Sequence, residues 1–167
     1  MNLKQFVPSS VCLKCDGCCR FQSADSPWRP KWDGTIANIS RPDGRGHREF
    51  TDDQNYVTTI QDCGQHLCRF FNKGDSTCRI YHDRPFECAL YPFILSKEAE
   101  ANKLYVHLSC PYIQDTEGTD MFNGYVEYLK SYFHRGDVLD FLKRNAFLTH
   151  DYSAFRGELQ FLFDLSI

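Results

Sequence analysis

The stretch Cys12-Leu13-Lys14-Cys15-Asp16-Gly17-Cys18-Cys19 places four cysteines within eight residues near the start of the chain. A Cys-x-x-Cys spacing allows two sulfurs to reach one ion from a tight turn, and backbone N–H groups in that turn can hydrogen-bond the thiolates. Two such spacings overlap here, and Gly17 gives the loop freedom to turn. Single free cysteines are often just small core residues, but this density indicates a metal-binding loop.

The later cysteines supply enough ligands for two centres. Cys18 and Cys19 are adjacent, and neighbouring side chains tend to point apart, so they are awkward ligands for one mononuclear ion. Two adjacent centres, or one cluster with an outlying thiol, would account for the pair. The spacing leaves the pairing of the sulfurs open. The predicted metal ligands are Cys12, Cys15, Cys18, Cys19, Cys68, Cys78, Cys88 and Cys110.

Zinc and an iron–sulfur cluster both suit these thiols. Zinc in a closed four-thiolate site has a structural role, because it has no redox chemistry and such a site keeps no open position. The first three cysteines of the block, followed by the remote Cys110-Pro111, are similar to the bacterial ferredoxin arrangement. Cys19 departs from that arrangement. We slightly favour an iron–sulfur cluster, of the [4Fe–4S] type, and keep zinc as the alternative.

Four other residues near the cysteine ligands are not predicted to bind metal. Cys63 is a lone cysteine and is interpreted as a small, buried apolar residue rather than a ligand. His66 and His82 lie a few residues from cysteines and are expected at the surface or beside the ligands, rather than on the metal. Arg84 is interpreted as a helix-cap or solvated residue, although a cation there would offset thiolate charge.

Composition narrows the class of protein. A chain of 167 residues is long enough for one domain with a real core. Nineteen Lys and Arg oppose 22 Asp and Glu without long runs of one sign, so nucleic acid is not an expected partner. The sequence shows neither an apolar leader nor a membrane span, and we expect a cytoplasmic protein. In that reducing compartment, the odd number of nine cysteines favours metal binding over disulfides.

The segment after the cysteine block, to about residue 62, is rich in Pro, Gly, Asp and Arg. This composition predicts an irregular connection with short extended pieces, such as Tyr56–Ile60. Trp28 and Trp32 are expected to anchor the connection to the core.

Two hairpins are predicted beyond this connection. The first carries Cys68 and Cys78 on its arms, around the turn Lys73-Gly74-Asp75-Ser76. The second pairs Tyr91–Ser96 with Leu104–Leu108, where apolar and polar residues alternate.

Helices are predicted between and after these hairpins. A short helix carries Cys88, with Pro85 in its first turn and Asp83 or Arg84 as its cap. From about Asp120, apolar residues recur at helical spacing. Gly136-Asp137 marks the end of this helix and the start of another, and a third is expected after Ser153, with Phe155, Leu159, Leu162 and Phe163 as its apolar stripe.

These elements predict an α+β fold: a small metal-stabilised domain with short antiparallel β-hairpins, irregular loops and a C-terminal helical segment. We expect a single domain over residues 1–167. Its cysteine-cluster, metal-binding core is expected at 11–112 and its helical extension at 119–167.

The residues resemble the YkgJ-like cysteine-cluster family, described as a zinc- or iron-chelating domain. The resemblance covers about residues 11 to 112. It rests on the block Cys12 to Cys19, Cys68, Cys78-Arg79-Ile80-Tyr81, Arg84-Pro85, Cys88, Tyr91-Pro92-Phe93 and Cys110. The family is often labelled iron–sulfur oxidoreductase and looks related to a flagellin lysine N-methylase. The resemblance therefore implies a metal and leaves the reaction open.

Three functions are compatible with these observations. The first is an iron–sulfur protein with redox or group-transfer chemistry, and the second is a zinc-stabilised module that binds another protein without catalysis. The third is a protein-modifying enzyme related to the methylase. The third rests on the resemblance alone, because the sequence has neither a glycine-rich nucleotide loop nor a Ser-His-Asp pattern. Whether the protein is an enzyme stays open.

Overall fold

The computed structural model describes residues 2–34 and 49–166 and divides the chain into two compact units. We call Pro8–Ala89 the cysteine unit. Met1–Val7 together with Leu90–Ile167 form the sheet unit. Each unit is described by itself. Part of the predicted irregular connection, residues 35–48, lies outside the described residues.

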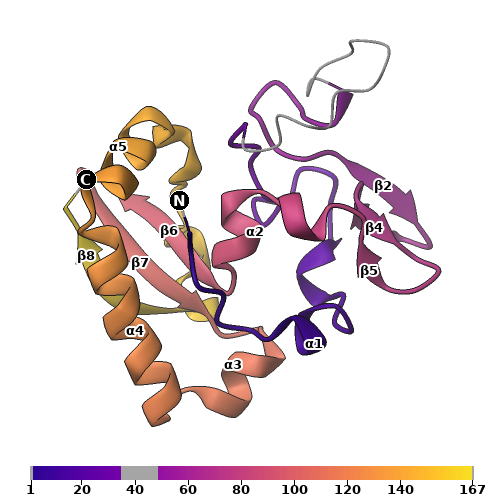
Figure 1. Ribbon diagram of the computed structural model, residues 1–167. Helices are drawn as coiled ribbons and strands as arrows, with labels where there is room; N and C mark the ends of the chain where they lie inside the picture. Colours follow the sequence, from indigo (N-terminus) through magenta and orange to yellow (C-terminus); the bar gives the residue numbers. More distant parts are fainter. Residues whose placement is uncertain (1, 35–48, 167) are drawn as a thin grey trace. The chain divides into compact units, whose positions relative to one another are not determined.

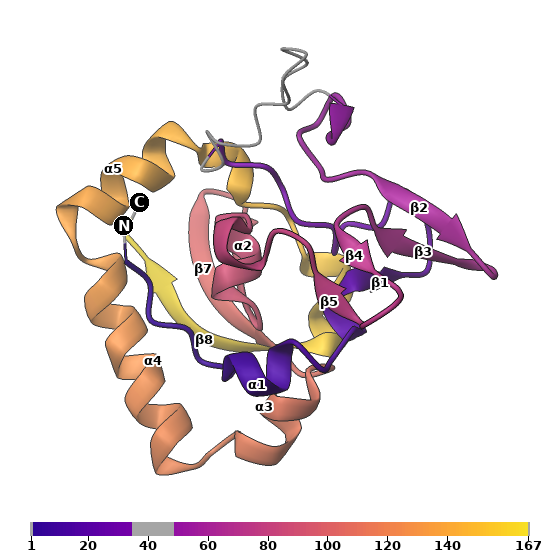
Figure 2. The ribbon, with the colours of Figure 1, turned by 45° about the vertical axis from the view of Figure 1, so that its right-hand side comes forward.

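The cysteine unit is built from short elements (Figure 1). In chain order they are α1 (Ser9–Cys12), the 3-10 turn η1 (Gly17–Cys19), β1 (Arg20–Phe21), β2 (Thr59–Asp62), β3 (Gln65–Cys68), β4 (Phe71–Asn72), β5 (Thr77–Cys78), the 3-10 turn η3 (Tyr81–Asp83) and α2 (Phe86–Leu90), whose last residue belongs to the sheet unit. Strand β3 lies between β1 and β2 and is antiparallel to both, as Figure 2 shows. Strands β4 and β5 form a separate hairpin.

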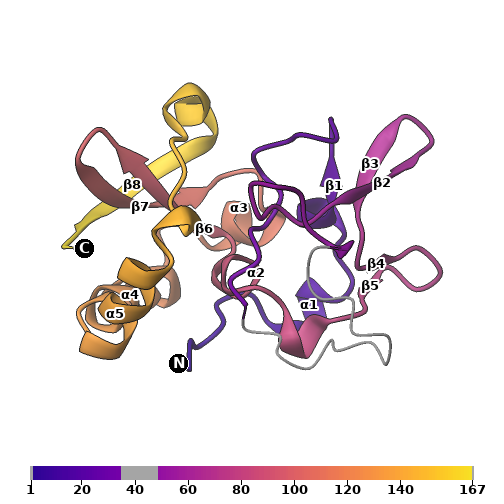
Figure 3. The ribbon, with the colours of Figure 1, turned by 90° about the horizontal axis from the view of Figure 1, so that it is seen from above.

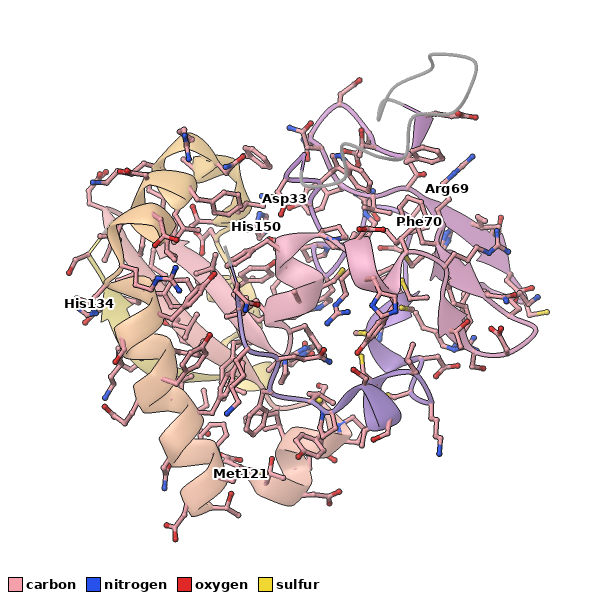
Figure 4. The ribbon with its side chains drawn as sticks, viewed as in Figure 1. Asp33, Arg69, Phe70, Met121, His134 and His150 are labelled. Atoms are coloured by element: carbon pink, nitrogen blue, oxygen red, sulfur yellow. The ribbon has the colours of Figure 1, made fainter. Side chains whose placement is uncertain are left out.

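An aromatic core supports these short strands. The ring of Trp32 stacks on Phe70 with centroids 5.9 Å apart, and Phe50 lies 5.4 Å from the same Phe70 ring. Phe70 is labelled in Figure 4. Trp28 packs against this core and is partly buried. The predicted anchoring role of the two tryptophans is therefore confirmed.

The first predicted hairpin is present, but its arms differ from the prediction. Phe71 pairs with Cys78, so Cys78 does lie on an arm. Cys68 does not, because it ends β3 and pairs with Thr59 of β2. The Arg69 N–H then donates to the Thr58 carbonyl at 3.1 Å, which continues the first sheet past Cys68. Cys68 therefore belongs to the preceding hairpin of β2 and β3, and the next hairpin begins only at Phe71.

Helix α2 forms where a short helix was predicted, but its cap is different. Arg84 has extended backbone (φ −66°, ψ 152°), and Pro85 directly precedes the first helical residue. The Phe86 N–H donates to Asp33 Oδ2 at 2.8 Å. The capping carboxylate therefore comes from a distant loop, and the prediction of Asp83 or Arg84 as the cap is wrong.

The sheet unit combines a three-stranded antiparallel sheet with helices (Figures 1 and 3). Its elements are β6 (Phe93–Glu98), β7 (Ala101–His107), α3 (Pro111–Thr116), α4 (Asp120–Phe133), α5 (Gly136–Arg144), the 3-10 turns η4 (Ala146–Leu148) and η5 (Ser153–Glu158), and β8 (Leu159–Leu165). Strand β7 lies between β6 and β8. The predicted second hairpin and the helical segment from Asp120 are confirmed, and together with the small sheets they confirm the α+β class.

Aromatic residues join the N-terminal segment, the sheet and α4 within this unit. Phe6 contacts Phe93 of β6 with centroids 5.6 Å apart and Tyr125 of α4 at 4.8 Å. The Lys4 N–H donates to the Tyr128 hydroxyl at 2.8 Å. Leu129 of α4 is fully buried. Among the described residues, no helix is both long enough and apolar enough to cross a bilayer.

The third helix predicted after Ser153 is wrong. Residues Ser153–Glu158 form a 3-10 turn, and Leu159–Leu165 form β8, which pairs with β7. Apolar residues at 159, 161, 163 and 165 also fit a strand period of two. A short apolar run does not distinguish a strand from a helix, and the open edge of β7 decides the outcome here by supplying backbone hydrogen bonds.

Candidate metal centre

The cysteine block is held by a helical turn and a 3-10 turn. The Val11 and Cys12 N–H groups both donate to the Pro8 carbonyl at 2.9 Å, which places Cys12 at the end of α1. After the intervening loop, the Cys19 N–H donates to the Asp16 carbonyl at 3.0 Å and closes η1. The block is therefore a short, hydrogen-bonded scaffold for its four thiols.

The two adjacent cysteines bring their sulfurs together. The Cys19 thiol hydrogen-bonds Cys18 and also Cys68 from β3. The side chains of Cys18 and Cys19 thus converge, although neighbouring side chains were expected to point apart, because η1 curls the backbone. The hydrogen bond from Cys19 lowers the pKa of Cys18 and of Cys68, and these bonds raise the pKa of Cys19. One proton-bearing thiol therefore stands between two thiols that favour the thiolate form.

Backbone N–H groups donate to two of the sulfurs, those of Cys68 and Cys78. Phe70 and Phe71 donate backbone hydrogen bonds to Cys68, and Ile80 donates one to Cys78. Each of these bonds favours the thiolate. The pKa of Cys68 is lowered overall, whereas burial outweighs the hydrogen bond at Cys78 and raises its pKa. N–H groups that reach a cysteine two residues earlier are the feature that supports thiolate ligands in metal-binding turns.

Four thiols from four segments interact electrostatically in every pair. Cys18 interacts with Cys68, and both interact with Cys78. Cys88 of α2 interacts with all three, and burial first, then these neighbours, raises its pKa well above the ordinary value. We call Cys18, Cys68, Cys78 and Cys88 the four-thiol set.

Cys12 and Cys15 adjoin this set. Burial raises the pKa of Cys12, and its thiol interacts electrostatically with Cys18 and with Cys15. Seven predicted ligands, which we call the thiol cluster, therefore come together in the cysteine unit: Cys12, Cys15, Cys18, Cys19, Cys68, Cys78 and Cys88. Figure 4 shows sulfur atoms, drawn in yellow, gathered near α1 and the β4–β5 hairpin.

The other candidates are two cysteines and two histidines. Cys110 is a buried residue of the sheet unit, at the N-cap of α3, and its ligand role stays a prediction. Cys63 is exposed in the β2–β3 turn with a positive φ of 46°, so its interpretation as a buried residue is wrong. His66 Nδ1 lies 3.4 Å from Thr59 Oγ1, and the exposed His82 packs edge-on against Tyr81.

Two side chains without a predicted ligand role reach the thiol cluster. Tyr81 hydrogen-bonds the Cys12 thiol, and its hydroxyl also donates to Ser9 Oγ at 3.0 Å. The Arg84 guanidinium stacks over the Tyr81 ring, 4.0 Å from the centroid. Tyr81 belongs to the Cys78-Arg79-Ile80-Tyr81 run, so the motif contained a signal for it, but spacing alone did not show that its hydroxyl turns toward Cys12.

A buried carboxyl group lies beside the cluster. Glu87 precedes Cys88 in α2, and its Oε2 accepts the Lys31 N–H at 2.5 Å. Burial raises the pKa of Glu87 to about 7. Its charge also raises the pKa of Cys88, which adds to the effect of burial. Sequence reasoning missed Glu87 because its partner is distant in the chain.

The donors fit a thiophilic metal by their chemistry, since thiolates are preferred by zinc and by iron–sulfur clusters. Within residues 2–34 and 49–166, however, no three His, Cys, Asp or Glu side chains are close enough to enclose an ion as they stand. Metal binding by these residues would require loss of the thiol protons.

Clustered cysteines whose thiolates accept backbone hydrogen bonds are typical of a metal-chelating domain. Residues 11–111 match the CxxCxxCC family, described as a putative zinc- or iron-chelating domain, and the chain belongs to this family. No curated protein and no solved structure matches the chain.

Proposed function

We propose that this protein holds a metal centre on the four-thiol set and uses it as an iron–sulfur protein, in redox or group-transfer chemistry. One observation supports this assignment above the others: Cys18, Cys68, Cys78 and Cys88 interact in every pair although they come from four separate segments. Four cysteine thiolates are the usual ligand set of [2Fe–2S] and [4Fe–4S] clusters. When bound, such a cluster supplies a reversible one-electron couple.

The surroundings suit thiolate ligation. Backbone N–H groups donate to Cys68 and Cys78, and hydrogen bonds to sulfur stabilise bound clusters and set their potential. Cys18, which also belongs to the four-thiol set, accepts a hydrogen bond from Cys19. Cys19 then serves as an outlying thiol that orients Cys18 and Cys68, which explains why two adjacent cysteines are useful at one centre.

The test is the metal content of the full chain purified without oxygen. We expect iron with acid-labile sulfide, a broad absorbance band near about 400 nm, and an EPR signal in one oxidation state, because thiolate-bound clusters have these properties. A colourless protein with stoichiometric zinc would replace this proposal with a zinc-stabilised scaffold that docks a partner. A protein with neither metal would overturn metal binding altogether.

A pair of variants tests the four-thiol set itself. Cys88→Ser removes a member, and we expect it to lose most of the bound metal. Cys63→Ser is the matched control, since Cys63 is exposed at a turn and should leave the metal content unchanged. Equal loss in both variants, or retention in Cys88→Ser, would contradict the assignment of these four sulfurs.

A further inference from the structure

Cys19 and Cys68 face each other across two paired strands of the cysteine unit. Strands β1 and β3 are antiparallel, and Arg20 of β1 pairs with Leu67 of β3. Continuing this register by one residue sets Cys19, which directly precedes β1, opposite Cys68, the last residue of β3. The two thiols are hydrogen-bonded, in agreement with this register. The strand pairing therefore brings together two sulfurs that lie far apart in the sequence.

The spacing of this pair suits a disulfide bond. Residues directly opposite each other on antiparallel strands have Cα atoms about 4.5 or 5.5 Å apart, and disulfides join Cα atoms about 4.4–6.8 Å apart. Cys19 also contacts Cys18, but consecutive Cα atoms are only about 3.8 Å apart, which is below that range. Cys68 is therefore the better disulfide partner for Cys19.

The two cysteines differ in access and in their relation to the four-thiol set. Cys19 is partly exposed whereas Cys68 is buried, so a small oxidant in solution reaches the Cys19 sulfur first. Cys68 belongs to the four-thiol set, and Cys19 lies outside it. A bond between the two sulfurs would leave the set with three thiols, one fewer than a closed thiolate centre requires.

We propose that Cys19 and Cys68 are a redox switch of the reduced, metal-free protein, in which a reversible disulfide withdraws Cys68 from the four-thiol set and blocks metal loading. The effect on metal loading rests on the proposed metal centre. The disulfide itself rests only on the strand register and on the contact between the two thiols.

Hydrogen peroxide is the oxidant for which the step is written. The Cys19 sulfur attacks one peroxide oxygen, which breaks the O–O bond and yields a sulfenic acid and one water. The Cys68 sulfur then attacks the Cys19 sulfur, forms the S–S bond and expels the hydroxyl group, which leaves as a second water with the remaining thiol proton. The two thiols thus lose two electrons and two protons, and the peroxide becomes two waters. A dithiol reductant reverses the bond by exchange.

The test is treatment of the reduced, metal-free full chain with one equivalent of hydrogen peroxide, followed by trypsin digestion and mass spectrometry without reduction. Trypsin releases Cys19 on the peptide 15–20 and Cys68 on the peptide 49–69. We expect these two peptides to be joined by a disulfide. The oxidised protein should also lose the thiolate-to-cobalt absorbance on titration with Co²⁺, and dithiothreitol should restore it.

Three variants assign the bond, because each peptide contains other cysteines. Cys19→Ser should abolish the joined peptides, and its affinity for Co²⁺ should be the same before and after peroxide. Cys18→Ser should retain the joined peptides. Cys63→Ser is the matched control, because it leaves Cys68 as the only cysteine of the peptide 49–69, and the bond should persist.

Absence of the joined peptides from the unaltered protein, their survival in Cys19→Ser, or their loss in Cys18→Ser or Cys63→Ser would overturn the switch. Unchanged Co²⁺ binding by the disulfide-bonded protein would overturn its effect on metal loading. Absence of the cobalt signal in the reduced protein would instead overturn the metal centre, and the joined peptides would still decide whether the disulfide forms.

Discussion

Glu98 shows how one carboxylate can organise a strand end in the sheet unit. It accepts hydrogen bonds from the Tyr105 hydroxyl at 2.5 Å, from Lys103 Nζ at 3.0 Å and from Arg156 Nη2 at 2.7 Å. The hydrogen bond from Tyr105, followed by that from Lys103, lowers the pKa of Glu98. Burial, with Glu98 as a second cause, raises the pKa of Tyr105 to about 12. The pair therefore joins β6 to β7 by a charge-assisted contact.

We predict that Glu98 stabilises the fold at neutral pH and that this contribution is lost in acid. The variant Glu98→Gln should lack the contribution at every pH. Because the folded pKa of Glu98 is lowered, its contribution is present above the unfolded value of about 4.3 and disappears as pH falls through the folded value. At pH 7, Glu98→Gln should lower the free energy of unfolding by about 1–2 kcal/mol. Urea unfolding at about pH 7 and pH 3.5 measures the free energy of unfolding of the unaltered protein and of Glu98→Gln.

The difference in free energy of unfolding between the unaltered protein and Glu98→Gln should be smaller at the lower pH. Glu100→Gln is the control, because Glu100 is exposed in the same turn and should change little. A constant difference at both pH values would show that Glu98 acts through packing rather than charge.

At the scale of elements, α2 depends on a residue outside its own sequence neighbourhood. The Asp33 carboxylate accepts the first helical N–H, from Phe86. A helix of five residues is too short to be stable alone, so this contact and packing must hold it. Since α2 carries Cys88, the loop that contains Asp33 also helps to place a predicted ligand.

We predict that Asp33→Ala lowers the free energy of unfolding by about 1 kcal/mol, the usual cost of removing an N-terminal cap. Asp33→Asn keeps an acceptor oxygen and should recover most of the loss. Asp53→Ala, at an exposed position, is the control. Thermal unfolding gives the stabilities, and equal values for Asp33→Ala and Asp53→Ala would contradict the capping role.

At the scale of the whole molecule, the two units are stabilised in different ways. The sheet unit has a well-packed aromatic core around Phe93 and α4, with Leu104 and Leu129 fully buried. The cysteine unit has strands of two to four residues and its own smaller core. A thiolate-bound metal contributes an apparent ~10–16 kcal/mol in small peptides, which is comparable to the roughly 5–15 kcal/mol stability of a whole domain.

We therefore predict that removing the metal unfolds the cysteine unit first. After treatment with a strong chelator under reducing conditions, amide hydrogens of β3 should exchange quickly while those of α4 stay protected. Hydrogen exchange read by mass spectrometry distinguishes the two regions in the full chain. Uniform protection before and after metal removal would contradict a stabilising role for the metal, and simultaneous loss in both units would indicate one cooperative domain, as the sequence predicted.

Much of the fold and most of the candidate site could be predicted from local sequence. The long amphipathic run from Asp120 fixed α4, and the alternating residues before His107 fixed the hairpin of β6 and β7. Cysteine density alone indicated a metal site, since no ordinary core requires four cysteines in eight residues. The family match at residues 11–111 agrees with that inference.

By itself, then, the sequence determined the α+β class, the helices with a strong period, and the chelating chemistry, because these depend on residue type and spacing within one segment. Only the tertiary structure decided that Leu159–Leu165 is a strand, that Asp33 caps α2, and which thiols approach each other. Those outcomes depend on the open edge of β7, on a carboxylate from a distant loop, and on four chain segments that bring their thiols together. Such contacts join residues far apart in the chain, so the propensities of a local segment do not predict them.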